Sequence, residues 1–203
     1  MPANLLSGNY QKKCIKGSKF LSSLDQDWNS LVSSVGPCKL NLSIELEPYQ
    51  ALIKSVIFQQ LRPASATAIF NRFKQNFDNN FPTEEKILAS PESKLKESGL
   101  SFNKRKTIIE IARHVQKGEL ENRQDFLMMN DSQIIEKLTK IKGIGEWTAQ
   151  MLMIFNLGKL DVFPAGDFAL RKNYSLFKSI ASPLTIRELS KISEEWKPFR
   201  SIA

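Results

Sequence analysis

Apolar residues recur at helical spacing along most of the chain, and two such stretches are separated by a pair of glycines. Ile134, Ile135 and Leu138 keep the spacing of one helix face, and the pattern stops at residues 142–145. It resumes from Trp147. Two glycines two residues apart allow a tight backbone turn that leaves N–H groups exposed. The pattern therefore predicts a helix, a glycine hairpin and a second helix.

The rest of the chain predicts short helices that end at glycine and proline. A helix over 24–35 ends at Gly36-Pro37, and Pro48 opens another helix that runs to about Leu61. About nine or ten helices are expected in all, with no alternation of strands and helices and no repeat. The predicted fold class is all-α.

Two segments near the N-terminus depart from this helical pattern. Residues 40–46 alternate strictly between apolar and polar side chains, as a strand does. Because a single strand would have no partner, we expect an extended crossing segment there. Residues 1–20 are polar with four lysines, and they predict a frayed basic arm or, alternatively, a phosphate contact.

The hairpin predicts an anion site. The second helix directs its unsatisfied N-terminal N–H groups and the positive end of its dipole back at the turn. Backbone amides near Gly143, Gly145 and Thr148, together with the Thr148 hydroxyl, are the expected donors, and Lys142 lies in the turn itself. The net charge of +8 and the pI near 9.5 fit either a polyanionic partner or a merely soluble basic protein. Phosphate is the anion we expect.

A loop over 161–166 follows the second helix and leads to Asp167, after which a further helix is predicted. Asp167 stands where an N-cap residue stands. A carboxylate that closely follows a phosphate-binding hairpin is also a candidate for chemistry on a nucleotide. The residues alone leave both interpretations open.

Composition excludes several classes of protein. Cys14 and Cys38 are the only cysteines, too few for an iron–sulfur cluster held by four thiolates, and no C-x-x-C pair suggests structural zinc. The longest apolar run is Met151–Phe155, far too short to span a membrane. No apolar segment follows the N-terminal lysines, so no secretory signal is expected.

Several motifs together carry a resemblance to a known family. The most specific block is Leu138-x-x-Ile141-x-Gly143-Ile144-Gly145-x-Trp147-Thr148-Ala149, followed by Asp161-Val162-Phe163-Pro164 and Asp167. Three further motifs are the helix Leu52–Leu61, Gly99-Leu100-Ser101-x-x-Lys104, and Trp196-Lys197-Pro198-Phe199-Arg200-Ser201. The chain resembles the helix-hairpin-helix (HhH-GPD) superfamily of DNA glycosylases, and within it the DNA-3-methyladenine glycosylase II branch. The match covers roughly residues 20–203.

The resemblance implies a single HhH-GPD domain over 1–203, built as two helical lobes with the active-site cleft between them. The central lobe is expected over about 48–160, and the second lobe combines 1–47 with 161–203. Asp167 would lie at the cleft. It would stabilise the positive charge that develops on the deoxyribose when the N-glycosidic bond breaks. Asp161 aligns with a non-catalytic position and is interpreted as structural.

The resemblance also implies residues that handle a flipped base. Because chemistry on a base in duplex DNA requires flipping it out, Leu61 is expected to fill the gap in the duplex. Gln60, directly before it, is expected to contact the DNA as well. Trp147 is the expected aromatic wall of the base pocket, beside Met151, which stands where a compared family member carries an aromatic residue. Each of these side chains could instead be ordinary core. Arg171 follows the catalytic loop and is a further candidate for DNA binding.

The cofactor expectations are limited to one monovalent cation. No cofactor is required and no iron–sulfur cluster is expected. The family binds a monovalent cation, Na⁺ or K⁺, through hairpin carbonyls, which by alignment are those of Thr139, Ile141 and Gly143. The basic run Lys104–Lys106 is interpreted as a solvated face that also meets the DNA backbone.

The predicted function is therefore that of a monofunctional glycosylase in base excision repair, which hydrolyses alkylated purines such as 3-methyladenine and 7-methylguanine from double-stranded DNA and leaves an abasic site. Hypoxanthine and ethenoadenine are further candidate substrates. One alternative is a bifunctional glycosylase/lyase, disfavoured because related lyases carry a nucleophilic lysine where this chain has Trp147. The other is a non-enzymatic DNA-binding module. A monomer is expected, without a membrane partner, in the cytoplasm or nucleoid of a prokaryote or the nucleus of a eukaryote.

Overall fold

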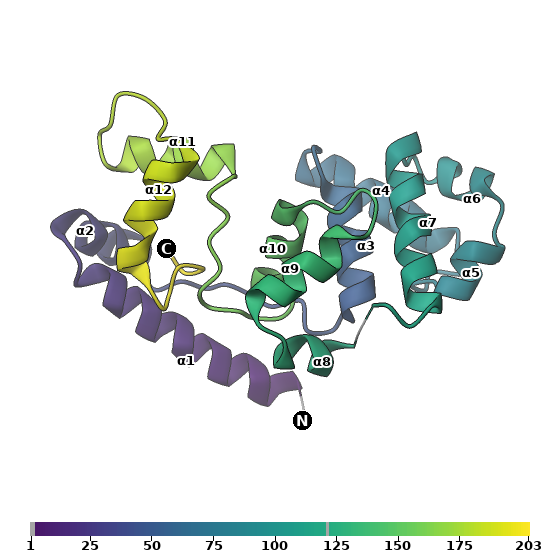
Figure 1. Ribbon diagram of the computed structural model, residues 1–203, viewed down its shortest axis with the longest axis horizontal. Helices are drawn as coiled ribbons and strands as arrows, with labels where there is room; N and C mark the ends of the chain where they lie inside the picture. The colour runs from purple at the N-terminus through teal and green to yellow at the C-terminus, as the bar shows by residue number, and fades with distance from the viewer. Residues whose placement is uncertain (1–2, 121) are drawn as a thin grey trace. The chain divides into compact units, whose positions relative to one another are not determined.

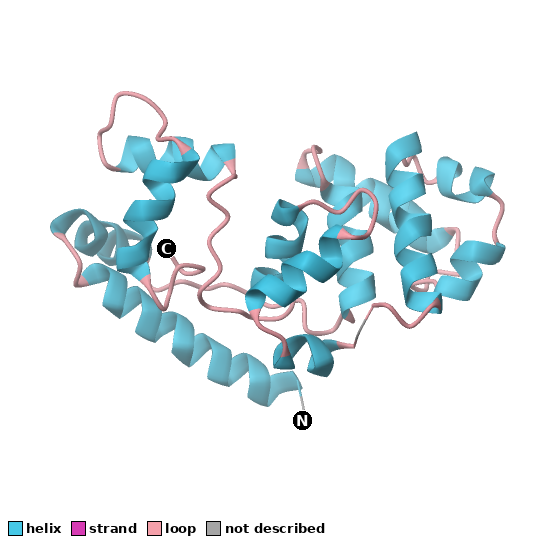
Figure 2. Cartoon of the chain, in the orientation of Figure 1, coloured by secondary structure: helices cyan, strands magenta, loops and turns pink. Residues whose placement is uncertain are grey.

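A computed structural model describes residues 3–120 and 122–203, and in this part of the chain helices are joined by loops, with no strand (Figure 2). The predicted all-α class is confirmed. The helices are α1 (Ala3–Ser22), α2 (Gln26–Val35), α3 (Pro48–Phe58), α4 (Pro63–Gln75), α5 (Glu84–Ala89), α6 (Glu92–Glu97), α7 (Phe102–Gln116), α8 (Arg123–Met128), α9 (Asp131–Thr139), α10 (Glu146–Phe155), α11 (Phe168–Phe177), α12 (Ile186–Ile192) and a 3₁₀ turn (Ser193–Trp196).

The chain divides into two compact units. Unit 2 is one continuous stretch, Glu45–Leu152, and unit 1 combines the described residues up to Ile44 with Met153–Ala203. The second boundary lies inside α10, whereas the sequence placed it after that helix, at about residue 160. The single family domain and its lobes stay a prediction.

Unit 2 is built around α3, which packs against α4 and α7 (Figure 1). Helix α3 begins with Pro48, which suits the first turn because proline lacks the N–H that would be unsatisfied there. Its side chains Leu52, Ile53, Val56 and Ile57 are fully buried. At roughly 1.5–3 kcal/mol for each fully buried aliphatic side chain, this one helix contributes much of the stability of the unit.

Unit 1 holds an aromatic core. Leu21 and Trp28 from the N-terminal segment pack with Leu189 and Trp196 from the C-terminal segment. The Trp28 and Trp196 rings meet edge to face, with centroids 5.6 Å apart, a favoured aromatic geometry. The two ends of the chain therefore build one core.

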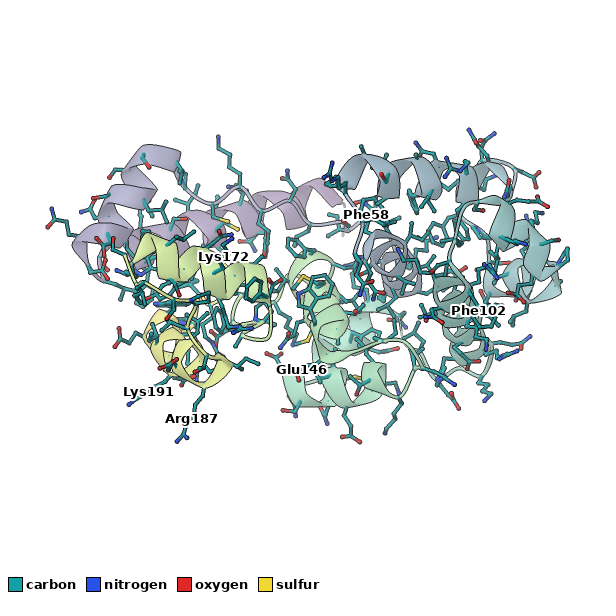
Figure 3. The ribbon with its side chains drawn as sticks, turned by 90° about the horizontal axis from the view of Figure 1, so that it is seen from above. Phe58, Phe102, Glu146, Lys172, Arg187 and Lys191 are labelled. Atoms are coloured by element: carbon teal, nitrogen blue, oxygen red, sulfur yellow. The ribbon has the colours of Figure 1, made fainter. Side chains whose placement is uncertain are left out.

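Helix α12 shows how the sequence supplies this core. Leu189 is fully buried, whereas Arg187 and Lys191 are exposed and project outward in Figure 3. A capping box at Thr185 and Glu188 begins the helix, with Thr185 Oγ1 accepting the Glu188 N–H at 3.2 Å.

The expectation of a frayed N-terminal arm is wrong. Residues 3–22 form α1, which buries Tyr10, Cys14 and Leu21. Lys12 and Lys16 lie on its exposed side. The buried apolar positions of α1 are separated mainly by lysines and other polar residues, and tertiary packing stabilises the helix.

In the expected crossing segment, 40–46, residues 40–43 form neither helix nor strand, and residues 44–46 form a turn and a bend. The segment is held on α10 because the Ser43 amide donates to the Phe155 carbonyl at 2.8 Å. The Asn156 side chain donates back to the Ser43 carbonyl, also at 2.8 Å. Across the described residues, no helix is both long and apolar enough to cross a membrane.

Candidate functional site

Helices α9 and α10 flank a glycine turn, as the sequence predicted. Asn130 caps α9, and its Oδ1 accepts the Gln133 N–H at 2.9 Å. The Ile144 amide donates to the Ile141 carbonyl at 3.0 Å and closes the turn. Gly143 has a φ of +95°, and a Cβ there would overlap the side chain of Thr107 on α7. A glycine is therefore required for the hairpin to lie against α7.

The hairpin presents an exposed backbone next to the start of α10. Lys142, Gly143 and Gly145 are all exposed. The first turn of an α-helix has N–H groups that no residue of the same helix can accept, and it carries the positive end of the dipole. This geometry suits a phosphate oxygen, and the role of these residues in DNA binding stays a prediction.

A hydrogen bond between side chains ties the end of α3 to the first turn of α10, a contact that the sequence did not reveal. We call Gln59–Leu61 the wedge loop. Gln59 Nε2 donates to Thr148 Oγ1 at 2.9 Å, so the Thr148 hydroxyl is engaged inside unit 2. Gln60 has a φ of +56°, an unusual value for a residue other than glycine, and the Leu61 side chain is 38% exposed. An exposed leucine after a strained turn suits insertion into a duplex, as predicted for Leu61.

Lys104 holds the wedge loop from the other side. Its Nζ donates to the carbonyls of Ile57 and Gln59, each at 2.8 Å, and so satisfies the end of α3. Burial lowers the pKa of this ammonium. The neighbouring Arg105 donates to Glu92 Oε1 at 2.9 Å and to the Leu100 carbonyl at 2.8 Å. The predicted solvated face at 104–106 is therefore wrong for these two residues, because both are held by partners within the unit.

A groove of about 810 Å³ runs between the wedge loop, α7 and the hairpin. It brings together Gln60, Lys142 and Gly143, three residues predicted from the sequence to contact DNA. Lys106 and Arg113 from α7 add positive charge, and Glu92 and Glu110 also line the groove.

Trp147 and Met151 lie one turn apart on the same side of α10, the helix that Figure 3 marks at Glu146. The Trp147 side chain is 40% exposed and Met151 is half-buried, while Thr148 and Leu152 are buried on the other side. An exposed indole can stack on a base or a cation. Their assignment to a base pocket stays a prediction.

Asp167 is the N-cap of α11. One carboxylate oxygen, Oδ1, accepts the N–H of Leu170 at 3.0 Å, and the Asp167 amide donates to the Pro164 carbonyl at 2.9 Å. The side chain is half-buried in unit 1. This is the usual position and hydrogen bond of an N-cap aspartate. A catalytic role for this capping carboxylate stays a prediction.

Arg171 lies one turn further along α11 and is engaged within unit 1. Its Nη1 donates to the Leu184 carbonyl at 3.0 Å, and its guanidinium stacks over the Phe168 ring with the carbon 5.6 Å from the centroid. A DNA contact by Arg171 stays a prediction, and it would have to use the guanidinium N–H groups not already engaged.

The described residues contain no group of three or more His, Cys, Asp or Glu side chains that could hold a metal ion. Cys14 and Cys38 are free thiols. The carbonyls predicted to hold a monovalent cation, at Thr139, Ile141 and Gly143, belong to the last turn of α9 and the hairpin. Carbonyl oxygens at the negative end of a helix dipole are suitable ligands for such an ion.

Comparison with known proteins places these features in context. Residues 53–198 match the family described as HhH-GPD superfamily base excision DNA repair protein. DNA-3-methyladenine glycosylase 1 of Schizosaccharomyces pombe is 38% identical over 190 residues, covering 93% of this chain and 83% of that protein. The alkylbase DNA glycosidase-like protein mag2 of the same yeast is 35% identical over 190 residues, covering 93% and 89%.

A solved structure of the S. pombe 3-methyladenine DNA glycosylase Mag1 in complex with abasic DNA superposes with a TM-score of 0.86. It is 38% identical and the match covers 92% of each chain. A DNA-3-methyladenine glycosidase from Bacillus halodurans superposes with a TM-score of 0.79 at 28% identity, covering 92% of this chain and 84% of that one.

Proposed function

Since this chain belongs to the HhH-GPD superfamily of base excision DNA repair proteins, we propose that it is a monofunctional DNA glycosylase that hydrolyses alkylated purines from double-stranded DNA and leaves an abasic site. The observation that carries the proposal is the placement of Asp167 as the N-cap of α11, in a chain 38% identical over 190 residues to a yeast DNA-3-methyladenine glycosylase.

Asp167 has a defined chemical role in this proposal. A purine alkylated at N3 or N7 is positively charged and leaves readily, and bond breaking develops oxocarbenium character on the deoxyribose. A carboxylate fixed near C1′ stabilises that charge electrostatically and orients the attacking water. The α11 cap supplies the fixation, since Oδ1 is held at 3.0 Å by the Leu170 N–H.

Unit 2 supplies the DNA contacts in the same proposal. The hairpin amides and Lys142 bind a backbone phosphate without reading sequence, and Leu61 fills the gap left by the flipped nucleotide. The exposed indole of Trp147 stacks on the extruded cationic base. Support for duplex DNA as the partner comes from the relative that was solved in complex with abasic DNA.

A lyase mechanism is disfavoured by the residue at the start of α10. A Schiff-base nucleophile would be a lysine at that position, where this chain has Trp147. 3-Methyladenine and 7-methylguanine are the leading substrates, the active species is a monomer, and the compartment is the one that holds the genome, the nucleoid or the nucleus.

We extend the proposal to a monovalent cation held by the carbonyls of Thr139, Ile141 and Gly143. Support comes from their position at the C-terminal end of α9. Such an ion would rigidify the turn and add positive charge next to the phosphate, without taking part in the hydrolysis itself.

The test compares base release from dimethylsulfate-treated DNA by the wild type and by Asp167→Asn. Asparagine keeps the cap oxygen but removes the charge, so the fold should persist while base release falls about 10²–10³-fold, as for loss of a preorganised electrostatic group. Asp25→Asn is the matched control, because Asp25 caps α2 through the same kind of bond, to Trp28 N–H at 2.9 Å. We expect it to release bases at the wild-type rate.

Two results would contradict the proposal. A folded wild type that binds DNA but frees no alkylated base would leave the non-enzymatic binding module. Strand cleavage at the abasic site, together with a covalent enzyme–DNA adduct that forms when borohydride reduces a Schiff base, would restore the lyase alternative. Full activity in Asp167→Asn would remove only the catalytic assignment of Asp167 and would leave the proposed reaction in place.

A further inference from the structure

The C-terminal segment 199–201 is hydrogen-bonded to the backbone that enters the Asp167 loop. The Ser201 amide donates to the Leu160 carbonyl at 2.9 Å. The Val162 amide donates to Ser201 Oγ at 2.9 Å, and that hydroxyl donates to the Val162 carbonyl at 3.0 Å. Both segments lie in unit 1, where Figure 1 shows the yellow end of the chain. The start of the loop is therefore fixed on both sides of Asp161.

Arg200 forms a bidentate ion pair with Asp161 itself. Its Nε donates to Oδ1 at 2.7 Å, and its Nη2 donates both to Oδ2 at 3.0 Å and to the Asp161 carbonyl at 2.9 Å. The Arg200 side chain is 21% exposed and that of Asp161 32% exposed, so the pair is only partly screened by water. A planar guanidinium that meets a carboxylate with two parallel bonds fixes orientation as well as distance, which a lysine cannot do.

The segment between the Arg200–Asp161 ion pair and Asp167 is held by packing and hydrogen bonds. Val162 and Ala165 are buried, and the Phe163 ring meets Trp196 edge to face at 5.3 Å. The Ala165 amide donates to the Phe163 carbonyl at 3.0 Å. The far end is held by the α11 cap. A shift at Asp161 would therefore be transmitted to Asp167 rather than absorbed by a flexible loop.

We propose that Arg200 is a positioning residue for the catalytic carboxylate: it acts through Asp161 to set where Asp167 meets the substrate. The inference rests on the function proposed above. Catalysis by a fixed charge depends steeply on placement, and a displacement of about 1 Å can lower a rate about 10²-fold. Arg200 would then affect the rate of bond breaking more than DNA affinity, which the hairpin provides.

The experiment measures single-turnover release of 7-methylguanine, with DNA affinity measured separately on a duplex that contains a reduced abasic site. Arg200→Lys keeps the positive charge but loses the bidentate hydrogen bonding to Asp161. Arg72→Lys is the control, because Arg72 also donates to a backbone carbonyl, that of Ser98 at 3.1 Å, but lies in unit 2 and does not line the groove. We expect Arg200→Lys to slow release about 10–100-fold while the Kd changes less than about threefold, and Arg72→Lys to match the wild type.

A second variant keeps the test decisive if Arg200→Lys does not fold. Asp161→Asn retains an oxygen for Arg200 but loses the charge, and it should also slow release with unchanged affinity. Wild-type release rates in a folded Arg200→Lys or, failing that, in Asp161→Asn would overturn the inference. Equal slowing in Arg72→Lys and Arg200→Lys, in step with lower melting temperatures, would show a structural effect only and would overturn it as well.

The two proposals fail in different ways. Release by the wild type with no effect of Arg200→Lys removes the positioning role and leaves the glycosylase intact. No release by the wild type removes both.

Discussion

Replacing Gly143 with alanine gives the most direct test of how the hairpin is held. The added Cβ would overlap Thr107 Oγ1 and lie 2.9 Å from both Thr107 Cβ and Cγ2. Thr107 is only 8% exposed and donates to the Asn103 carbonyl at 3.0 Å, so its side chain cannot swing away freely. Either the hairpin or α7 must move.

The expected cost has two parts. An L-residue at a φ of +95° is strained by roughly 1–2 kcal/mol, and forcing a methyl group into a packed contact costs roughly 1–3 kcal/mol more. The free energy of unfolding should therefore fall by roughly 2–5 kcal/mol, which is a drop in Tm of roughly 4–20 °C for a chain of this size. Affinity for abasic-site DNA should fall too, since the displaced turn carries the amides that we propose to bind a phosphate.

Gly145→Ala is the control within the same hairpin. Gly145 is not among the glycines with positive φ, and nothing lies within 4 Å of a Cβ built there. We expect a change of less than about 0.5 kcal/mol, as for ordinary surface substitutions. Thermal and urea unfolding of both variants provide the assay. Equal stability of Gly143→Ala and Gly145→Ala would refute the reasoning, whereas partial rescue of Gly143→Ala by Thr107→Ala would support it.

Three further outcomes follow from other contacts. Lys104→Met leaves two carbonyls at the end of α3 without their donor, so the free energy of unfolding in urea should fall by about 1–3 kcal/mol. Lys106 is exposed, and Lys106→Met should lower it by less than about 0.5 kcal/mol. Equal losses in the two variants would contradict the buried contact. The hydrogen bond from Lys178 lowers the pKa of the Asp25 carboxyl, so its stabilisation is present above about pH 4 and is lost as the pH falls through the folded-state pKa. The Tm of Asp25→Asn should therefore drop less than that of the wild type between about pH 5 and pH 2.5, and parallel curves would count against this. Replacing K⁺ and Na⁺ by tetramethylammonium at constant ionic strength should weaken DNA binding, and an unchanged Kd would argue against the hairpin cation.

The helical class, the hairpin and the cap at Asp167 could be predicted because each has a local sequence signal. Glycines two residues apart mark the turn, and Asp167 stands directly before an apolar period. Such signals depend only on neighbouring residues, which is why they survive without knowledge of the tertiary structure.

The supporting contacts could not be predicted in the same way. Lys104 lies in a run of three basic residues, which indicates a solvated face, yet its Nζ bonds carbonyls 45 and 47 residues away in the chain. Arg200 and Asp161 are 39 residues apart. Carbonyls are present on every residue, so a bond to one has no sequence signature. Lys104 and Arg200 do lie in motifs that resemble the family, and that resemblance was the sequence signal available for them.

The division of the chain has a consequence for how the protein is made. Unit 2 is continuous, so it can complete its core while the ribosome is still adding residues after Leu152. Unit 1 cannot, because α1 has to wait for partners such as Leu189 and Trp196 that are synthesised more than a hundred residues later. We therefore expect nascent chains to acquire the hairpin and wedge loop first and the carboxylate last. In that interval the emerging chain would hold the elements proposed to bind DNA in folded form, while the apolar side of α1 still needs to be shielded from aggregation.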